Sequence, residues 1–146
     1  MKTHYKKIII DIIACLFILL FLYTAANKVW EFHNFDWVLS TLPMIGELHK
    51  IIAYSVPTAE IITSCLLLVP LTRRDGLIYS FLLMLIFTTY LLFMVIYTKD
   101  LPCNCGGVIS HLSWKQHIVF NLFFLALSLI AFNFNKDIVR TKQVKR

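Results

Sequence analysis

Two cysteines that are one residue apart, Cys103 and Cys105, carry the most distinctive chemistry in this chain. They can close a disulfide, but the small ring strains its geometry, and strained or exposed disulfides are the more oxidising and labile ones. Such a short bridge also adds little long-range constraint. Gly106 and Gly107 follow directly and let another molecule approach closely. If the pair oxidises, the spacing favours thiol–disulfide exchange over a structural bridge.

A metal site is the alternative interpretation of the same pair. Cys103 and Cys105 together with His111 and His117 supply a plausible set of soft ligands, although their spacing matches no strong zinc pattern. We therefore predict no metal and keep these four residues as the fallback ligand set. His117 can also simply lie at a membrane interface.

The other two cysteines, Cys15 and Cys65, lie within long apolar runs at matching distances from one side of a membrane. That placement permits a relay of thiols across the bilayer. Free cysteine is also a small hydrophobic residue that is often buried for packing, and we favour this interpretation.

Glu60 is an ionisable residue near the middle of an apolar run, three residues after Pro57. At that depth a carboxylate is costly, and it marks a functional site that faces the bundle interior. Lys28 is a candidate counter-charge and Asn121 a candidate hydrogen-bond partner. A structural polar contact between helices explains the same residues equally well.

The chain's composition shows what must hold these residues in place. Of its 146 residues, 59% are hydrophobic and 15% are charged, with a mean hydropathy of +0.75. Soluble domains carry about 25% charged residues, and a membrane-spanning helix needs about 20 apolar ones. The predicted fold is therefore all-α: one membrane domain over residues 1–146, built as a four-helix bundle. Its predicted transmembrane helices cover residues 8–27, 51–71, 76–97 and 116–134.

The basic residues predict the orientation of this bundle. Ten of the fourteen Lys and Arg fall on one side of it and four on the other. Because flanking Lys and Arg stay in the cytoplasm, we expect both termini inside and the cysteine loop outside, in the inner (cytoplasmic) membrane. The net charge of +6 thus reports topology and contact with anionic lipid, and predicts no nucleic-acid partner.

Two further segments complete the predicted topology. In the first outer loop, Phe35, Val38, Leu39 and Leu42 recur at helical spacing up to Pro43, which predicts a short interfacial helix. The first apolar run is longer than the core of a cleaved signal peptide and contains Asp11, so we expect a retained helix.

Taken together, these motifs resemble the MauE branch of the DoxX-like four-helix membrane proteins, named for methylamine utilisation. The resemblance covers nearly the whole chain. Where many members have Cys-Gly-Cys-Phe-Gly, this chain has Cys-Asn-Cys-Gly-Gly, so its substrate or partner can differ. The segments that carry the resemblance are Tyr23-Thr24-Ala25-Ala26-Asn27-Lys28, Val56-Pro57-Thr58-Ala59-Glu60, Cys103-Asn104-Cys105-Gly106-Gly107, Leu112-Ser113-Trp114 and Asn121.

The resemblance implies a redox-associated role in the maturation of extracytoplasmic proteins, such as disulfide formation in a methylamine dehydrogenase subunit. It leads to the hypothesis of a thiol–disulfide oxidoreductase that acts through Cys103 and Cys105 on an extracytoplasmic thiol protein. Glu60, Lys28 and Asn121 would then line a cavity for a quinone head group or for proton transfer. The direction of electron flow, the attacking cysteine and the oligomeric state stay open. The alternative is a non-catalytic assembly factor or metal-binding protein that uses the same outer loop.

Overall fold

The computed structural model describes residues 2–42, 45–97 and 114–144, and five helices lie within these ranges. Four of them, all except α2, are long and apolar enough to cross a membrane. The predicted all-α fold with four candidate spans is thus confirmed. The helices are α1 (Lys2–Trp30), α2 (Phe32–Ser40), α3 (His49–Leu68), α4 (Arg73–Tyr97) and α5 (Trp114–Val144).

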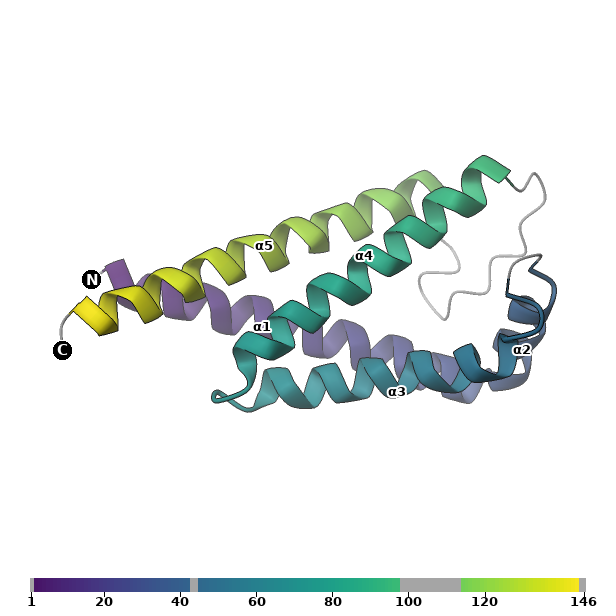
Figure 1. Ribbon diagram of the computed structural model, residues 1–146, viewed down its shortest axis with the longest axis horizontal. Coiled ribbons are helices and arrows are strands. Elements are labelled where there is room, and N and C mark those ends of the chain that lie inside the picture. Colours follow the sequence, from purple (N-terminus) through teal and green to yellow (C-terminus); the bar gives the residue numbers. More distant parts are fainter. Residues whose placement is uncertain (1, 43–44, 98–113, 145–146) are drawn as a thin grey trace.

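The four long helices form one elongated bundle (Figure 1). In it α1 packs against α3 and α5, while α4 packs against α5 and α3. Both chain termini and the turn between α3 and α4 lie at one end, which we call the basal end; α2 lies at the opposite, distal end (Figure 1). The start of α1 and the end of α5 therefore lie at the same end of the bundle.

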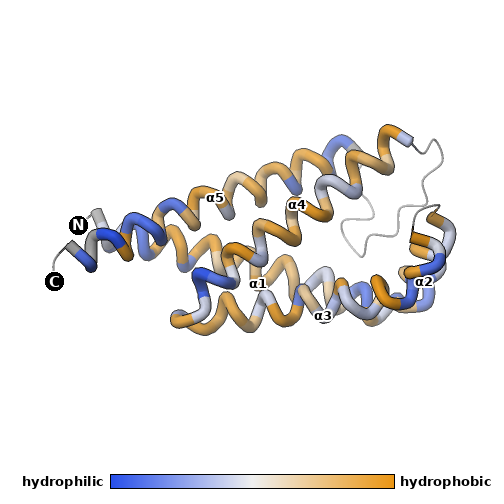
Figure 2. Tube along the Cα trace, viewed as in Figure 1, coloured by the Kyte–Doolittle hydropathy of each residue, from blue (hydrophilic) through white to orange (hydrophobic). Residues whose placement is uncertain are grey.

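The four long helices are apolar along most of their length (Figure 2), and many of their large apolar side chains lie on the surface of the bundle. Large side chains such as Leu19, Ile51 and Ile86 are more than 60% exposed on it. Such a continuous apolar surface is stable only against another apolar phase, and hydrocarbon supplies one. The chain is accordingly a multi-pass membrane protein.

Aromatic residues fill the centre of the bundle. Phe17 and Phe21 on α1 are 0% exposed. The Phe17 ring meets Phe124 of α5 edge-on, with 5.2 Å between the ring centroids. This contact fixes the distance between α1 and α5.

Ion pairs join the helices at the basal end. Lys6 Nζ of α1 lies 2.6 Å from Asp137 Oδ2 of α5. Asp11 of α1 pairs with Arg73 at the start of α4. Asp11, whose side chain is 45% exposed, thus contacts a neighbouring helix.

A glycine brings α3 and α4 together near their connecting turn. A Cβ atom at Gly76 would lie 2.9 Å from the Leu67 backbone nitrogen and 3.0 Å from its side chain. Gly76 therefore permits a close helix approach at the basal end that a larger residue would prevent.

Most helix ends differ from the predicted boundaries: α1 begins at Lys2 and ends at Trp30 instead of covering residues 8–27, and α3, α4 and α5 begin two or three residues earlier than predicted. The ends of α3 and α5 differ as well. We predicted that the second span extends to residue 71, but α3 ends at Leu68 and Val69 is extended (φ −86°, ψ 120°). Pro70 explains this end, because the residue before a proline avoids the helical region. We predicted the last span up to residue 134, whereas α5 continues to Val144 as a polar extension of the same helix.

The short helix predicted between the first two spans is present as α2. Leu39 and Leu42 are buried, in agreement with the helical spacing of apolar residues noted in the sequence. His49 Nδ1 of α3 lies 2.5 Å from Asp36 Oδ1 and attaches α2 to the start of α3. The distal end is thus covered on the α1–α3 side.

Candidate functional site

A buried ion pair joins α1 to α3 in the middle of the bundle. Lys28 Nζ lies 2.6 Å from Glu60 Oε1, and the same oxygen accepts a hydrogen bond of 3.1 Å from Thr24 Oγ1. The Glu60 side chain is 0% exposed and that of Lys28 is 10% exposed. The pair is therefore almost completely shielded by protein.

Helix geometry explains how two residues from different depths meet. Each Cα–Cβ bond tilts toward the N-terminus of its own helix. Since α1 and α3 run in opposite directions, Lys28 leans from the distal end toward the basal end and Glu60 leans the opposite way. Thr24, one turn before Lys28 on the same face, completes the contact.

The second carboxylate oxygen of Glu60, Oε2, is buried and has no hydrogen-bond partner in the described part of the chain. A buried polar atom in this state is rare and is costly. Its hydrogen-bonding capacity is available to a ligand.

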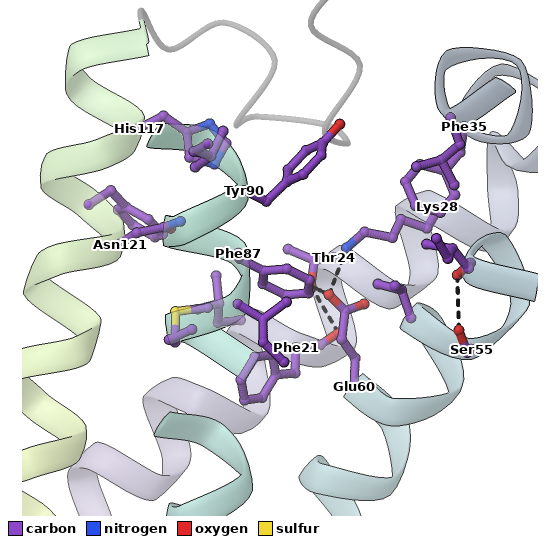
Figure 3. Close-up of a pocket in the computed structure, with 18 of the residues that line it drawn as sticks. Phe21, Thr24, Lys28, Phe35, Ser55, Glu60, Phe87, Tyr90, His117 and Asn121 are labelled. Carbon is purple, nitrogen blue, oxygen red and sulfur yellow. Dashed lines mark hydrogen bonds and ion pairs between the residues drawn. The ribbon is translucent and has the colours of Figure 1, made fainter. Parts of the chain in front are cut away.

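Glu60 lines a cavity of about 370 Å³ that all five helices border (Figure 3). Most of its lining is apolar, and aromatic rings are prominent. Lys28 Nζ lies 5.5 Å from the centroid of the Phe87 ring and 6.0 Å from that of Phe35, so the cation also faces two of these rings. The cavity is thus an aromatic pocket with one polar end. Its aromatic lining residues are Phe21, Phe35, Phe87, Tyr90 and Phe120.

Two polar residues of α5 border the same cavity, across from Glu60 (Figure 3). His117 is 7% exposed and Asn121 is 4% exposed. His117 Nδ1 is buried and has no hydrogen-bond partner within the described residues. We predicted that Asn121 bonds to Glu60, and this is wrong: the partners of Glu60 Oε1 are Lys28 and Thr24.

The structure therefore brings together four of the residues singled out from the sequence on the lining of one cavity: Lys28, Glu60, His117 and Asn121. It adds Phe87 and Tyr90 of α4, which the sequence did not single out. It also places Thr24 and Phe35 on the lining, which the sequence named only within a motif and a short helix. The sequence could have identified Thr24, because it lies four residues before Lys28 and so on the same face of the helix. It could not have identified Phe87, because Phe87 is one of many apolar residues in its helix.

The predicted cysteine pair, Cys103 and Cys105, lies outside the described residues, as does His111. The ends of the helices that flank this segment are described: α4 ends at Tyr97 and α5 begins at Trp114. Both helices line the cavity within two turns of these ends, through Tyr90 and His117. The chain thus enters and leaves the cysteine segment close to the cavity.

No metal centre is seen among the described residues, where no three His, Cys, Asp or Glu side chains cluster. Of the fallback ligands only His117 is described, and it belongs to the cavity lining.

Cys15 and Cys65 are both free and exposed on the bundle surface. The interpretation that they are buried for packing is therefore wrong. An apolar run does not show which of its faces points inward, because lipid and protein interior are equally apolar.

Comparison with known proteins agrees with this architecture. Residues 6–134 match the family model of the methylamine utilisation protein MauE. No curated protein and no solved structure shows significant similarity to the chain. Because the family match covers four helices of the bundle together with the Lys28–Glu60 site, this four-span membrane protein belongs to the MauE family.

Proposed function

We propose that this protein is a thiol–disulfide redox protein that assists the maturation of extracytoplasmic proteins. The observation that carries the proposal is the aromatic cavity with its Lys28–Glu60 pair, which lies close to both ends of the segment that holds Cys103 and Cys105. Transfer of electrons from a thiol pair to a bound acceptor would need a cavity of this kind close to the thiols. Membership of the MauE family supports the same role.

The chemical step belongs to Cys103 and Cys105. A thiolate of the partner protein attacks the disulfide between them, which forms a mixed disulfide and releases one of the two cysteines. The partner's second thiolate then attacks the partner's own sulfur in the mixed disulfide and releases the other cysteine. The partner leaves with a new disulfide, while Cys103 and Cys105 become thiols and retain two electrons and two protons. Either cysteine can be the one attacked.

The cavity would hold the acceptor for these electrons. A bound quinone would accept two electrons and two protons. The cavity fits its head group, because aromatic rings match a flat ring. Glu60 Oε2 and His117 Nδ1 have no partners among the described residues, and Oε2 can accept a hydrogen bond from a hydroxyl of the quinol that forms. Lys28 holds the Glu60 carboxylate in place, so that Oε2 faces the ligand, and Asn121 supplies a further polar group.

The proposed orientation places the cysteine segment where disulfides persist. The ten-to-four division of Lys and Arg puts the basal end in the cytoplasm and the distal end outside, in the inner membrane. The partner is then an extracytoplasmic protein with a thiol pair.

Trapping of the mixed disulfide tests the proposal. In a chain with Cys15→Ala and Cys65→Ala, either Cys103→Ser or Cys105→Ser should accumulate a complex with a partner protein that a reductant releases. The matched control is the same chain with both Cys103→Ser and Cys105→Ser, which should trap nothing. Normal maturation of the partner in this last variant would refute a redox role, and would favour a non-catalytic assembly factor if the partner still co-purifies.

A further inference from the structure

The wall of the cavity between α3 and α4 contains residues that are also exposed on the outside of the bundle. Ile86 of α4 lines the cavity and is 61% exposed, and Ser55 of α3 lines it and is exposed as well. A side chain can line the cavity and also be exposed on the outside of the bundle only at the edge of an opening. Among the described lining residues, these two therefore mark a mouth between α3 and α4.

The arrangement of the two helices explains this opening. They lie close together at Gly76 and Leu67, next to their turn. From there they separate toward the distal end, as Figure 1 shows. Ile86 lies beyond the contact, where Val56 and Ile52 of α3 face the cavity from the other side.

The mouth lies at a depth where the bundle is surrounded by hydrocarbon. Ile86 follows the start of α4 at Arg73 by about 20 Å along the helix axis, at 1.5 Å per residue. Ser55 precedes the end of α3 at Leu68 by about the same axial distance. Since the hydrocarbon core is about 30 Å thick, both residues fall within it.

The charges of the cavity restrict what can enter. Lys28 and Glu60 neutralise each other at 2.6 Å. A phosphate-bearing head group would meet the Glu60 carboxylate without a spare cation among the described lining residues. A neutral head that donates a hydrogen bond to Glu60 Oε2 suits the site, and an apolar tail suits the mouth.

We propose that the opening between α3 and α4 is a lateral portal through which a bilayer-dissolved quinol or quinone places its head beside Glu60 and leaves its tail in the lipid. This rests on the proposed function for the class of ligand. The hydroxyl of the quinol donates to Glu60 Oε2, and its ring lies among Phe21, Phe87 and Phe120. The tail passes between Ile86 and Val56.

Binding of a benzoquinol with a decyl tail to the protein in lipid nanodiscs tests the portal. Ile86→Trp fills the path of the tail and should raise the Kd at least about tenfold, which corresponds to about 1.4 kcal/mol. The matched control is Leu85→Trp, which puts the same ring on the neighbouring lipid-facing position, 43% exposed and outside the cavity lining, and should leave the Kd unchanged. Ile86→Ala should also retain binding, because it leaves the path open.

The remaining outcomes test three claims independently: the portal, the role of Glu60 in the binding site, and the redox function. Equal binding by Ile86→Trp and the parent protein would overturn the portal. Loss of binding by Leu85→Trp as well would show that a tryptophan on this part of α4 disturbs the fold rather than blocks the tail, and would also overturn the portal. Glu60→Gln should weaken binding, and unchanged binding would remove Glu60 from the site. Failure of Cys103 and Cys105 to trap a partner, with decyl-quinol binding and its loss in Ile86→Trp intact, would refute the redox function and leave the portal standing.

Discussion

Replacing Lys28 with methionine removes the cation that lies 2.6 Å from Glu60 Oε1 and leaves a carboxylate that is 0% exposed. Removing one partner of a buried ion pair costs about 3–5 kcal/mol, because the other charge stays buried. Lys28→Met keeps most of the apolar stem of the lysine, so little of this loss comes from packing. We therefore expect a decrease of about 3 kcal/mol in the free energy of unfolding.

Glu60→Gln is the complementary change. It keeps the size of the side chain and an acceptor for Thr24 and Lys28, and it should cost about 1–2 kcal/mol as a charge-assisted hydrogen bond becomes a weaker one. In the double variant neither charge remains. Its loss should be smaller than the sum of the single losses, with a coupling energy of about 2 kcal/mol.

Reversible unfolding in mixed micelles, followed by tryptophan fluorescence, measures all four proteins of this double-mutant cycle. The pair Lys6 and Asp137, which is exposed at the basal end, is the control and should show almost no coupling. Polar contacts between membrane helices average about 0.6 kcal/mol. A coupling at or below that value for Lys28 and Glu60 would refute the buried ion pair as the main contact between α1 and α3.

Three further predictions concern other parts of the molecule. A reporter fused after Arg146 should be cytoplasmic and one inserted at Asn104 external; an external C-terminus would reverse the proposed orientation. Cys15 and Cys65 should react with a lipid-soluble maleimide but not with a membrane-impermeant one, because they are exposed on apolar faces; labelling by the impermeant reagent would contradict that position. Gly76→Ala should destabilise the protein by about 1–3 kcal/mol, since its Cβ would overlap Leu67, and a thermal unfolding midpoint equal to that of the parent would contradict the close contact.

Charged residues made part of the site predictable from the sequence. Glu60 and Lys28 interrupt apolar runs, and a charge at membrane depth is costly enough to imply a partner. The same reasoning made Lys28 a candidate counter-charge for Glu60, and the structure contains this ion pair.

Apolar residues gave no comparable signal. A soluble helix shows its buried face by the contrast between apolar and polar positions, but α4 is apolar on all sides. Neither the contribution of Phe87 and Tyr90 to the cavity nor the outward position of Cys15 and Cys65 could therefore be predicted. The sequence did not predict the pairing of Asp11 with Arg73 for a different reason. Water can solvate a charged side chain near the end of a span as well as a partner residue can.

The position of α1, in contact with every other helix of the bundle, has a consequence for biosynthesis. This helix leaves the ribosome before the other helices of the bundle, so when it is made neither Glu60 nor the helices that pack against it exist yet. Until then the Lys28 ammonium must extend to the aqueous interface, as lysines near helix ends do. When α3 enters the bilayer it brings the carboxylate that draws this side chain into the protein interior. The residues of the Lys28–Glu60 pair are thus both present once α3 has been made, before α4 and α5 exist.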